Sequence, residues 1–470
     1  MKKIISFLIF ICAFYGVSFA NNISTSNIYI TGQNAASDFS LINFNLTWDN
    51  SWRTSTNENN WDGAWVFIKF RKANSGNWQH ATINYASPGD ATACGHTAPS
   101  GSFIKTPSDG KGAFIYRSAA GSGTVNWSNI RLRWNYGADG VLDGDSVEIR
   151  LFAIEMVYCP QGNYNLGSGG TEYYHFRDGA VDTYYPVTSE NAITCGNSSG
   201  NLWSDGGIYW FTGTLPAAFP KGYAAVWCMK YEVSQQQYID FLNTIDYNKY
   251  INRNSYNSAY ITGTHPNLIA TYPERAMTYI SCLDLLALLD WSALRPFTEL
   301  EYEKIARGNN QMPVANEYAW GNTTITQVSN PTNAGTNTET WTVGNCNFTS
   351  LSEAIRCGAL ATATSNRTSS GASYYGVMEL SGNVYEWAIS AYDAIGRAYT
   401  GAHGDGYLAA NGNHDAPNWS NTSGSGLSIR GGALNSNAGN CTVSDRTYGG
   451  YVNIQKTGSN MGGRGCRTGE

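Results

Sequence analysis

One thiol and two arginines stand in an unusual setting of glycines near the C-terminus. Arg430 is followed by two glycines, Cys441 lies nine residues beyond them, and Arg464 follows another pair of glycines. A thiolate can act as a nucleophile or bind a soft metal ion. The planar guanidinium of arginine binds carbonyls or carboxylates through parallel hydrogen bonds. We therefore interpret Cys441 as a candidate for thiol chemistry and the two arginines as internal supports of the surrounding loops.

A second segment carries the oxygen atoms that calcium requires. The stretch from Gly382 to Glu386 is expected to turn sharply at its glycine and to place carbonyls next to carboxylates. Calcium takes about six to eight oxygen ligands from side chains, carbonyls and water. This segment is a candidate calcium site. The alternative is that its acids accept hydrogen bonds from neighbouring backbone groups without a metal.

Together with the stretch from Tyr375 to Trp387, these segments resemble the formylglycine-generating, or sulfatase-modifying factor, family. The stretch from Met156 to Ser168 resembles the family's opening strand and turn, so the resemblance covers about residues 155–470. It implies an α+β domain with the C-type-lectin-like fold and long ordered loops. The family contains copper-dependent oxidases and also members that only bind, so the fold leaves the function open.

In the family's oxidases, two copper-binding cysteines fall four and nine residues after the second glycine of the Arg-Gly-Gly segment. Here these positions hold Ser436 and Cys441. Cu(I) is soft and is held by thiolates, whereas a serine hydroxyl stays protonated at neutral pH, so we expect no copper. Cys441 would be catalytic only in an enzyme, and otherwise is a disulfide partner or a buried thiol. Another cysteine near Cys441, for example Cys466, would favour the oxidase.

The resemblance also implies which atoms would hold calcium. They are the side chains of Glu379 and Glu386 and the carbonyls of Gly382 and Val384. Two residues depart from the family's pattern, because Glu379 stands where Asn or Asp is usual and Tyr385 where Trp is usual. We predict a structural calcium ion at these four ligands.

The stretch from Leu434 to Ser459 mixes Asn, Ser, Thr, Gly and Tyr. Tyrosine supplies rigid contact area and the small polar residues supply adaptable hydrogen bonds, as in antibody paratopes. In the family's enzymes this region lines the substrate groove, and it resembles the variable C-terminus of diversified lectin-fold receptors. The alternative is an ordinary hydrophilic loop layer. The candidate groove residues are Ser436, Asn437, Tyr448 and Tyr451.

Three helices are expected to position these segments. They run over about residues 234–242, 282–291 and 298–308, and capping boxes begin the first and the third. We interpret the acids of the third helix as capping, helix-dipole and surface-pairing residues. The stretches 309–358 and 388–426 are rich in Gly, Asn, Thr and Ser and are expected to cover the sheet as ordered loops.

The N-terminal third has a different pattern. Residues 1–20 are typical of a secretory signal peptide, cleaved near Ala20. Residues 21–153 form short alternating strands separated by turn residues, which predicts an all-β sandwich that buries its own core. Its last strand is expected at Val147–Ala153. The second domain then covers residues 154–470.

Charge and cysteine content exclude several classes of protein. The formal net charge is −6, and it becomes −8 when Lys2 and Lys3 leave with the signal peptide. Such a chain offers little to a phosphate backbone, so no nucleic-acid partner is expected. The chain contains no second long apolar run, so no membrane-spanning helix is expected. Nine of the ten cysteines remain after processing, an odd count that leaves at least one thiol unpaired where export permits disulfides.

Three functions stay open. The first is a non-catalytic recognition protein, secreted to the periplasm or cell surface, that binds a peptide, protein or glycan. The second is a copper-dependent oxidase that converts a cysteine of an exported sulfatase to formylglycine. The third is a structural component of the envelope or of a surface assembly. Ser436 in place of a copper-binding cysteine favours the first.

Overall fold

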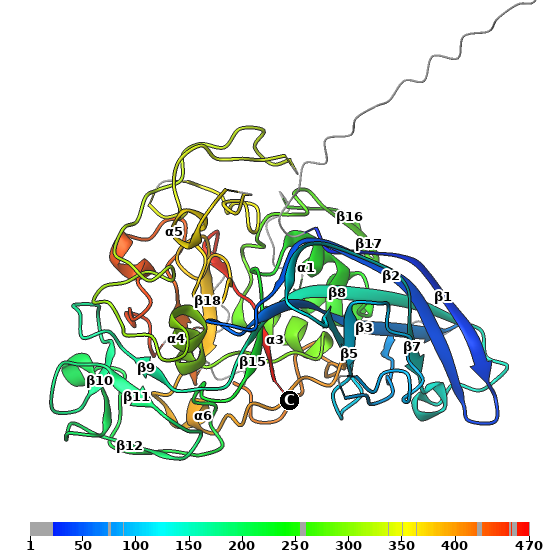
Figure 1. The fold of residues 1–470 in the computed structure, drawn as a ribbon, viewed down its shortest axis with the longest axis horizontal. Coiled ribbons are helices and arrows are strands. Elements are labelled where there is room, and N and C mark those ends of the chain that lie inside the picture. Colours follow the sequence, from blue (N-terminus) through cyan, green and yellow to red (C-terminus); the bar gives the residue numbers. More distant parts are fainter. Residues whose placement is uncertain are drawn as a thin grey trace, which may run out of the picture.

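Strands dominate the computed structural model and helices are few (Figure 1). The signal peptide expected at residues 1–20 and the groove residue Tyr451 lie outside the described residues. Among the residues that are described, no helix is both long and apolar enough to span a membrane. The structure describes residues 22–73, 77–87, 89–253, 260–336, 338–349, 351–362, 364–420, 425–450, 453 and 458–469.

The N-terminal part is built from strands in two groups. In one group β2 pairs with β1 and β7, and in the other β3 pairs with β8, β6 and β4, while β5 pairs with β6. The two groups are joined where β2 pairs with β3 at Arg53 and Trp61. Apolar side chains of both groups, among them Phe44 and Val66, meet in one core. The strands are β1 (Ser24–Asn34), β2 (Phe39–Arg53), β3 (Trp61–Lys72), β4 (Gln79–His80), β5 (Ser102–Lys105), β6 (Ala113–Arg117), β7 (Gly121–Trp134) and β8 (Val147–Cys159).

Both faces of β3 are buried, and its second face packs on the C-terminal part of the chain. Trp65 donates a hydrogen bond from its indole nitrogen to the carbonyl of Ser292 at 2.9 Å. The ring of Phe67 meets the ring of Trp291 edge-on, with centroids 5.0 Å apart. The N-terminal strands therefore have a core of their own on one face of β3 and share a core with the rest of the chain on the other.

The strand expected to end at Ala153 continues without a break to Cys159. It pairs with β3 from Val147 to Tyr158 and with β15 (Val226–Met229) from Met156 to Cys159. β15 in turn pairs with β21 (Cys466–Thr468). The expectation of two separate strands around residue 154 is wrong, because no turn residue interrupts this apolar stretch. One sheet crosses from the N-terminal strands to the end of the chain.

The remaining strands of the C-terminal part form four small sheets. The three-stranded sheet of β18 (Tyr385–Ile389), β19 (Leu427–Arg430) and β20 (Met461–Gly462) carries the motif segments. The others are β9 (Tyr164–Leu166) with β11 (Tyr185–Val187), β16 (Ile261–Thr264) with β17 (Asn267–Ala270), and β10 (Phe176–Asp178), β12 (Ile193–Cys195), β13 (Leu202–Ser204) and β14 (Gly213–Leu215) together.

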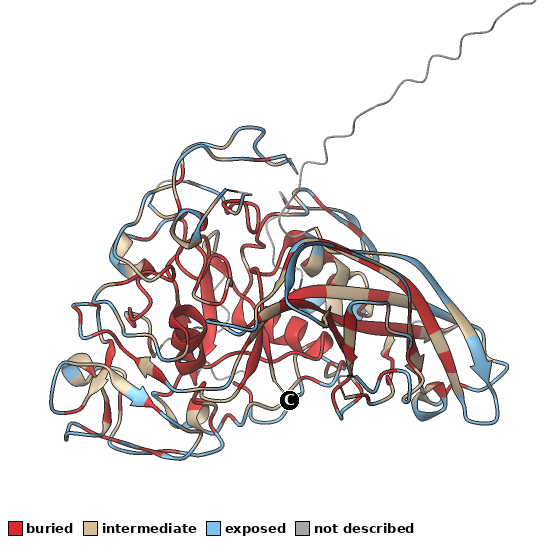
Figure 2. Cartoon of the chain, in the orientation of Figure 1, coloured by how far each residue is buried: buried red, intermediate tan, exposed pale blue. Residues whose placement is uncertain are grey.

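The three expected helices are confirmed as α1 (Gln235–Leu242), α3 (Cys282–Trp291) and α4 (Glu299–Arg307). Each begins with a capping box, as predicted for the first and third. Buried residues concentrate around α3, α4, β8 and β18, and exposed residues follow the outer loops and β1 (Figure 2). The short helices are α2 (Tyr247–Tyr250), α5 (Arg367–Ser370) and α6 (Ala394–Arg397), with 3-10 turns at Tyr136–Asp139, Asp205–Gly207, Ile251–Arg253 and Ala438–Cys441.

Candidate functional site

The motif segments, far apart in the chain, meet in the sheet of β18, β19 and β20. Glu386 on β18 lies opposite Arg430 on β19 and Gly462 on β20. Gly382, just before β18, has a φ of 86°, which glycine adopts readily and which makes the expected sharp turn. The amide of Gly382 donates to the carbonyl of Gly431 at 2.7 Å. The sheet therefore places the Gly-Asn-Val-Tyr-Glu and Arg-Gly-Gly segments side by side.

The two arginines are internal supports, as expected. Arg464 is fully buried and binds Glu386 with two hydrogen bonds of 2.8 and 2.7 Å. Arg430 is 1% exposed, binds Glu303 at 2.8 Å and lies 3.6 Å from Glu299. Each arginine thus pairs with a carboxylate that is itself buried.

The acids of α4 are not surface residues, and the expectation of surface pairing is wrong. Glu299 and Glu303 are fully buried. Glu299 accepts two hydrogen bonds from Arg446, at 2.9 and 3.0 Å. Glu303 is shared between Arg430 and Arg307. The capping interpretation holds for Glu301, whose side chain accepts the amide of Thr298 at 2.9 Å.

Ser436 and Tyr385 form a buried pair of hydroxyl groups. Ser436 is 6% exposed, and its hydroxyl donates to the hydroxyl of Tyr385 at 2.8 Å while it accepts the amide of Ala433 at 2.9 Å. The ring of Tyr448 stands edge-on to that of Tyr385, with centroids 5.6 Å apart. Burial raises the pKa of Tyr385, so this phenol stays protonated. The structure thus brings Ser436 and Tyr448 together around Tyr385.

The thiol of Cys441 is fully buried at the end of the 3-10 turn Ala438–Cys441. Its neighbour is the thiol of Cys346, whose pKa is raised by burial and then by Cys441. Cys466, the cysteine suggested from the sequence, lies instead opposite Cys228 in the pair of β21 and β15. No spacing rule pointed to Cys346, because it sits in a loop with no motif of its own.

The other candidate groove residues differ in how exposed they are. Asn437 caps the same 3-10 turn, because its side-chain oxygen accepts the amide of Asn440 at 3.1 Å. Its side chain is exposed, whereas Tyr448 is half-buried and packs on the main core. Tyr451 lies outside the described residues. In this region the exposed side chain of Asn437 is accessible to a ligand, and the half-buried side chain of Tyr448 is partly accessible.

The four expected calcium ligands differ in how well they fit a cation. Both oxygens of Glu386 are taken by Arg464, so an ion there would face a guanidinium. Glu379 is 6% exposed; one of its oxygens accepts the amide of Gly358 at 2.8 Å, and the other is buried without a hydrogen-bond partner. A buried acceptor without a partner is costly. Glu379 therefore suits a cation and Glu386, as paired, does not.

A third buried carboxylate completes this cluster. Glu232 is 1% exposed and accepts the amide of Val384 at 3.1 Å and the side-chain amide of Asn383. Burial raises the pKa of Glu379 to about 7, against the opposing effect of Arg464. Arg464 acts on all three carboxylates and Arg356 acts in addition on Glu379, so the acids outnumber the two guanidinium groups around them.

A different set of carboxylates also lies close together. The oxygens of Asp290, Asp405 and Asp415 fall within 4.8 Å of one another. Asp290 is fully buried and accepts the amides of Asp405 at 3.0 Å and Asp415 at 2.9 Å. Burial raises its pKa to about 7. These hydrogen bonds account for the cluster as an anchor of the 405–415 loop.

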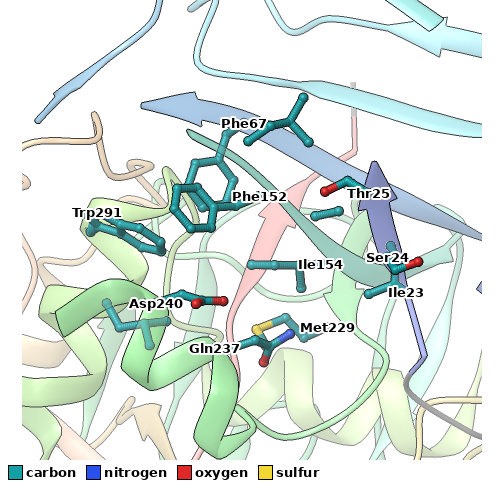
Figure 3. Close-up of a pocket in the computed structure, with 13 residues that line it drawn as sticks. Ile23, Ser24, Thr25, Phe67, Phe152, Ile154, Met229, Gln237, Asp240 and Trp291 are labelled. Carbon is teal, nitrogen blue, oxygen red and sulfur yellow. The ribbon is translucent and has the colours of Figure 1, made fainter. Parts of the chain in front are cut away.

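A pocket of about 140 Å³ lies where the N-terminal strands meet the helices (Figure 3). The aromatic rings of Phe67, Phe152 and Trp291 line one part of it, and Gln237 and Asp240 of α1 line another. Burial raises the pKa of Asp240 to about 6. Sequence reasoning missed this pocket because its walls come from β1, β3, β8, β15, α1 and α3, which no single motif connects. None of the expected groove residues lines it.

The motif segments of this domain thus lie in a small sheet that buried arginines hold and glycine turns flank. Residues 153–467 match the family model described as "Sulfatase-modifying factor enzyme 1-like domain", and the chain belongs to this family. The resemblance seen in the sequence is confirmed. No curated protein matches the chain.

The variant Arg430→Ala is expected to lower the free energy of unfolding by about 1.5 to 3 kcal/mol, because it removes a buried charge-assisted hydrogen bond to Glu303 and leaves that carboxylate with Arg307 alone. The matched control is Arg71→Ala, which removes a solvent-exposed pair with Glu148 and should cost at most about 1 kcal/mol. Urea denaturation of both variants measures the difference. Equal losses would show that Arg430 is not a structural support.

Proposed function

We propose that this protein is a secreted, non-catalytic recognition protein of the periplasm or cell surface. In this proposal a β-sandwich at residues 21–153 is joined to a C-type-lectin-like domain at residues 154–470, which binds a peptide, protein or glycan. The observation that carries the proposal is that the Cys441 thiol is fully buried, while the position of the other copper ligand holds Ser436, whose hydroxyl is bonded to Tyr385.

A group of surface tyrosines supports a binding role. Tyr173 is 66% exposed and Tyr392 is 36% exposed. Tyr174 lies between Tyr173 and Tyr209, at centroid distances of 6.1 and 5.5 Å, and Tyr209 meets Tyr392 at 5.7 Å. We call these four residues the aromatic surface. Aromatic rings of this kind offer rigid, amphipathic contact area to sugars and peptides.

The aromatic surface adjoins the expected groove through Arg446. The amide of Arg446 donates to the carbonyl of Tyr173 at 2.8 Å, and its guanidinium donates to the carbonyls of Tyr174 and Tyr209 at 3.0 and 3.2 Å. Gly450 packs so closely that a Cβ there would lie 2.5 Å from Tyr209 and 2.9 Å from Tyr392. The segment leading to Tyr448 and the aromatic surface therefore form one continuous region.

The binding role predicts that Tyr392→Ala and Asn437→Ala weaken ligand capture and leave the fold intact. Loss of an aromatic anchor typically costs about 2 kcal/mol of binding free energy, whereas a surface change alters stability by about 0.5 kcal/mol or less. The measurement is binding of labelled protein to arrays of glycans and peptides, beside a melting curve. Tyr247→Ala, on α2 and 62% exposed, is the matched control.

Unchanged array binding in Tyr392→Ala and Asn437→Ala, with a lowered melting temperature, would identify these side chains as packing residues. The binding surface would then have to lie elsewhere on the chain.

The copper-dependent oxidase is the second candidate, and one observation favours it. Cys346 lies beside Cys441 and supplies a second thiol, although position 436 holds a serine. Burial raises the pKa of the Cys346 thiol well above its ordinary value, which opposes formation of the thiolate that Cu(I) requires. The recognition role therefore stays our first proposal.

We predict that the reduced protein retains no stoichiometric copper in competition with a chromogenic Cu(I) chelator. The reason is the burial of both thiols and the hydroxyl at position 436. Copper retained by the natural protein and lost in Cys441→Ser would contradict the non-catalytic role. A hydroxyl variant at a distant buried thiol, Cys195→Ser, controls for general unfolding.

Calcium belongs to this proposal as a structural ion at Glu379, with the carbonyls of Gly382 and Val384 as further ligands. The buried, unpartnered oxygen of Glu379 supports it. A ligand that binds only the folded form stabilises it by about 2.7 kcal/mol at a hundred times its Kd. Calcium should therefore raise the melting temperature over that measured with excess chelator, and Glu379→Gln should remove the difference.

Glu386→Gln is the matched control for the calcium experiment, since it disturbs the Arg464 pair and should lower stability equally with calcium and with chelator. Superimposed melting curves of the natural protein under the two conditions would rule out the calcium ion.

A further inference from the structure

Two cysteines from distant parts of the chain are held by a single residue. Cys346 lies in the loop between α4 and α5, and its thiol donates to the carbonyl of Ser381 at 3.0 Å. The hydroxyl of Ser381 donates to the carbonyl of Cys441 at 2.7 Å. Both cysteines belong to the same buried cluster beneath β18, and each is at most 1% exposed.

Glycine turns make room for the two sulfur atoms. A Cβ on Gly382 would lie 2.4 Å from the sulfur of Cys346, and a Cβ on Gly432 would lie 2.5 Å from the sulfur of Cys441. Both distances are far below van der Waals contact, so any other residue would push the sulfur away. The two turns are joined by the hydrogen bond from Gly382 to Gly431. The backbone thus brings both sulfurs to one place.

The thiols also act directly on one another and on the same neighbour. After burial, the Cys441 thiol is the group that most raises the pKa of Cys346. Tyr318 belongs to the same buried cluster, and burial, then Cys441 and then Cys346 raise its pKa to about 12. The shared Ser381, the joined glycine turns and the common buried cluster therefore place the two thiols next to one another.

We propose that Cys346 and Cys441 are a site of reversible oxidation that forms an intramolecular disulfide by exchange with a small-molecule or protein disulfide. One thiol, as its thiolate, attacks a sulfur of the oxidant R–S–S–R and releases R–SH. The second thiol then attacks the mixed disulfide, forms the Cys346–Cys441 bond and releases another R–SH. Both protons of the cysteines end on the two released thiols, so the oxidant is reduced and the pair oxidised.

The timing of this reaction follows from burial. A thiol that is buried and protonated exchanges slowly, because the thiolate is the nucleophile. The bond therefore forms during folding, after the glycine turns have brought the sulfurs together and before the surrounding core closes over them. Once formed, the disulfide joins the loop after α4 to the chain that follows the Arg-Gly-Gly segment. The sulfur of Cys441 is then no longer a thiolate that could bind a metal. This inference does not depend on what the protein binds.

The test is refolding of the whole mature chain from denaturant in glutathione disulfide with reduced glutathione, then alkylation of free thiols and peptide mapping by mass spectrometry. Trypsin cuts after Arg307, Arg356, Arg430 and Arg446, so Cys346 lies in peptide 308–356 and Cys441 in peptide 431–446, each without a second cysteine. We expect these two peptides to be linked before reduction, and each to gain one alkylated thiol after it.

Cysteine-to-serine variants distinguish loss of the Cys346–Cys441 disulfide from a general loss of folding. Cys346→Ser should leave Cys441 as an alkylated thiol, and Cys441→Ser should do the same for Cys346, while Cys195→Ser should keep the link. A reductant should lower the melting temperature of the natural protein and leave that of Cys346→Ser unchanged. Alkylated thiols at both Cys346 and Cys441 in the refolded natural protein, or a bond from Cys441 to any other cysteine, would overturn the proposal even if the variants do not fold.

Discussion

Buried ion pairs between α4 and the last forty residues hold the C-terminal part together. Glu299 binds Arg446, and Glu303 binds Arg430, all at 1% exposure or less. Burial by itself would raise the pKa of Glu303, yet Arg307 and Arg430 lower it below its ordinary value. This stabilisation is present above the pKa of the unfolded chain and is lost as pH falls through the folded pKa. Because an unpaired buried charge is so costly, α4 and the C-terminal loops are stable only together.

A second constraint ties the N-terminal strands to this arrangement. β8 is shared between both parts of the chain, and β3 has no face left for solvent. Its tryptophan and phenylalanine side chains reach α3 and the residue that follows it. The position of α3 therefore depends on the N-terminal strands, and so does the pocket that Trp291 and α1 line with β3 and β8.

Local chemistry in the sequence predicted the helices well, because capping boxes act over three residues and are visible in the chain. It failed for Glu299 and Glu303, since glutamate is almost always exposed and their partners Arg446 and Arg430 lie more than a hundred residues away. The end of a strand expected at Ala153 is wrong, because β8 continues to Cys159 and no turn residue lies between Leu151 and Cys159. Cys346 could not be found, because its meeting with Cys441 depends on two glycine turns.

The two departures of this chain from its family explain one another. The resemblance to the family implies tryptophan at position 385 and cysteine at position 436; this chain has tyrosine and serine there, and the hydroxyl of Ser436 donates a hydrogen bond to that of Tyr385. The indole of tryptophan has only a donor, so it could not accept that bond. Tyr385 thus supplies an acceptor for the Ser436 hydroxyl that an indole would not. The hydroxyl of Ser436 is thus part of a hydrogen-bonded core, and the thiol of Cys441 lies next to that of Cys346.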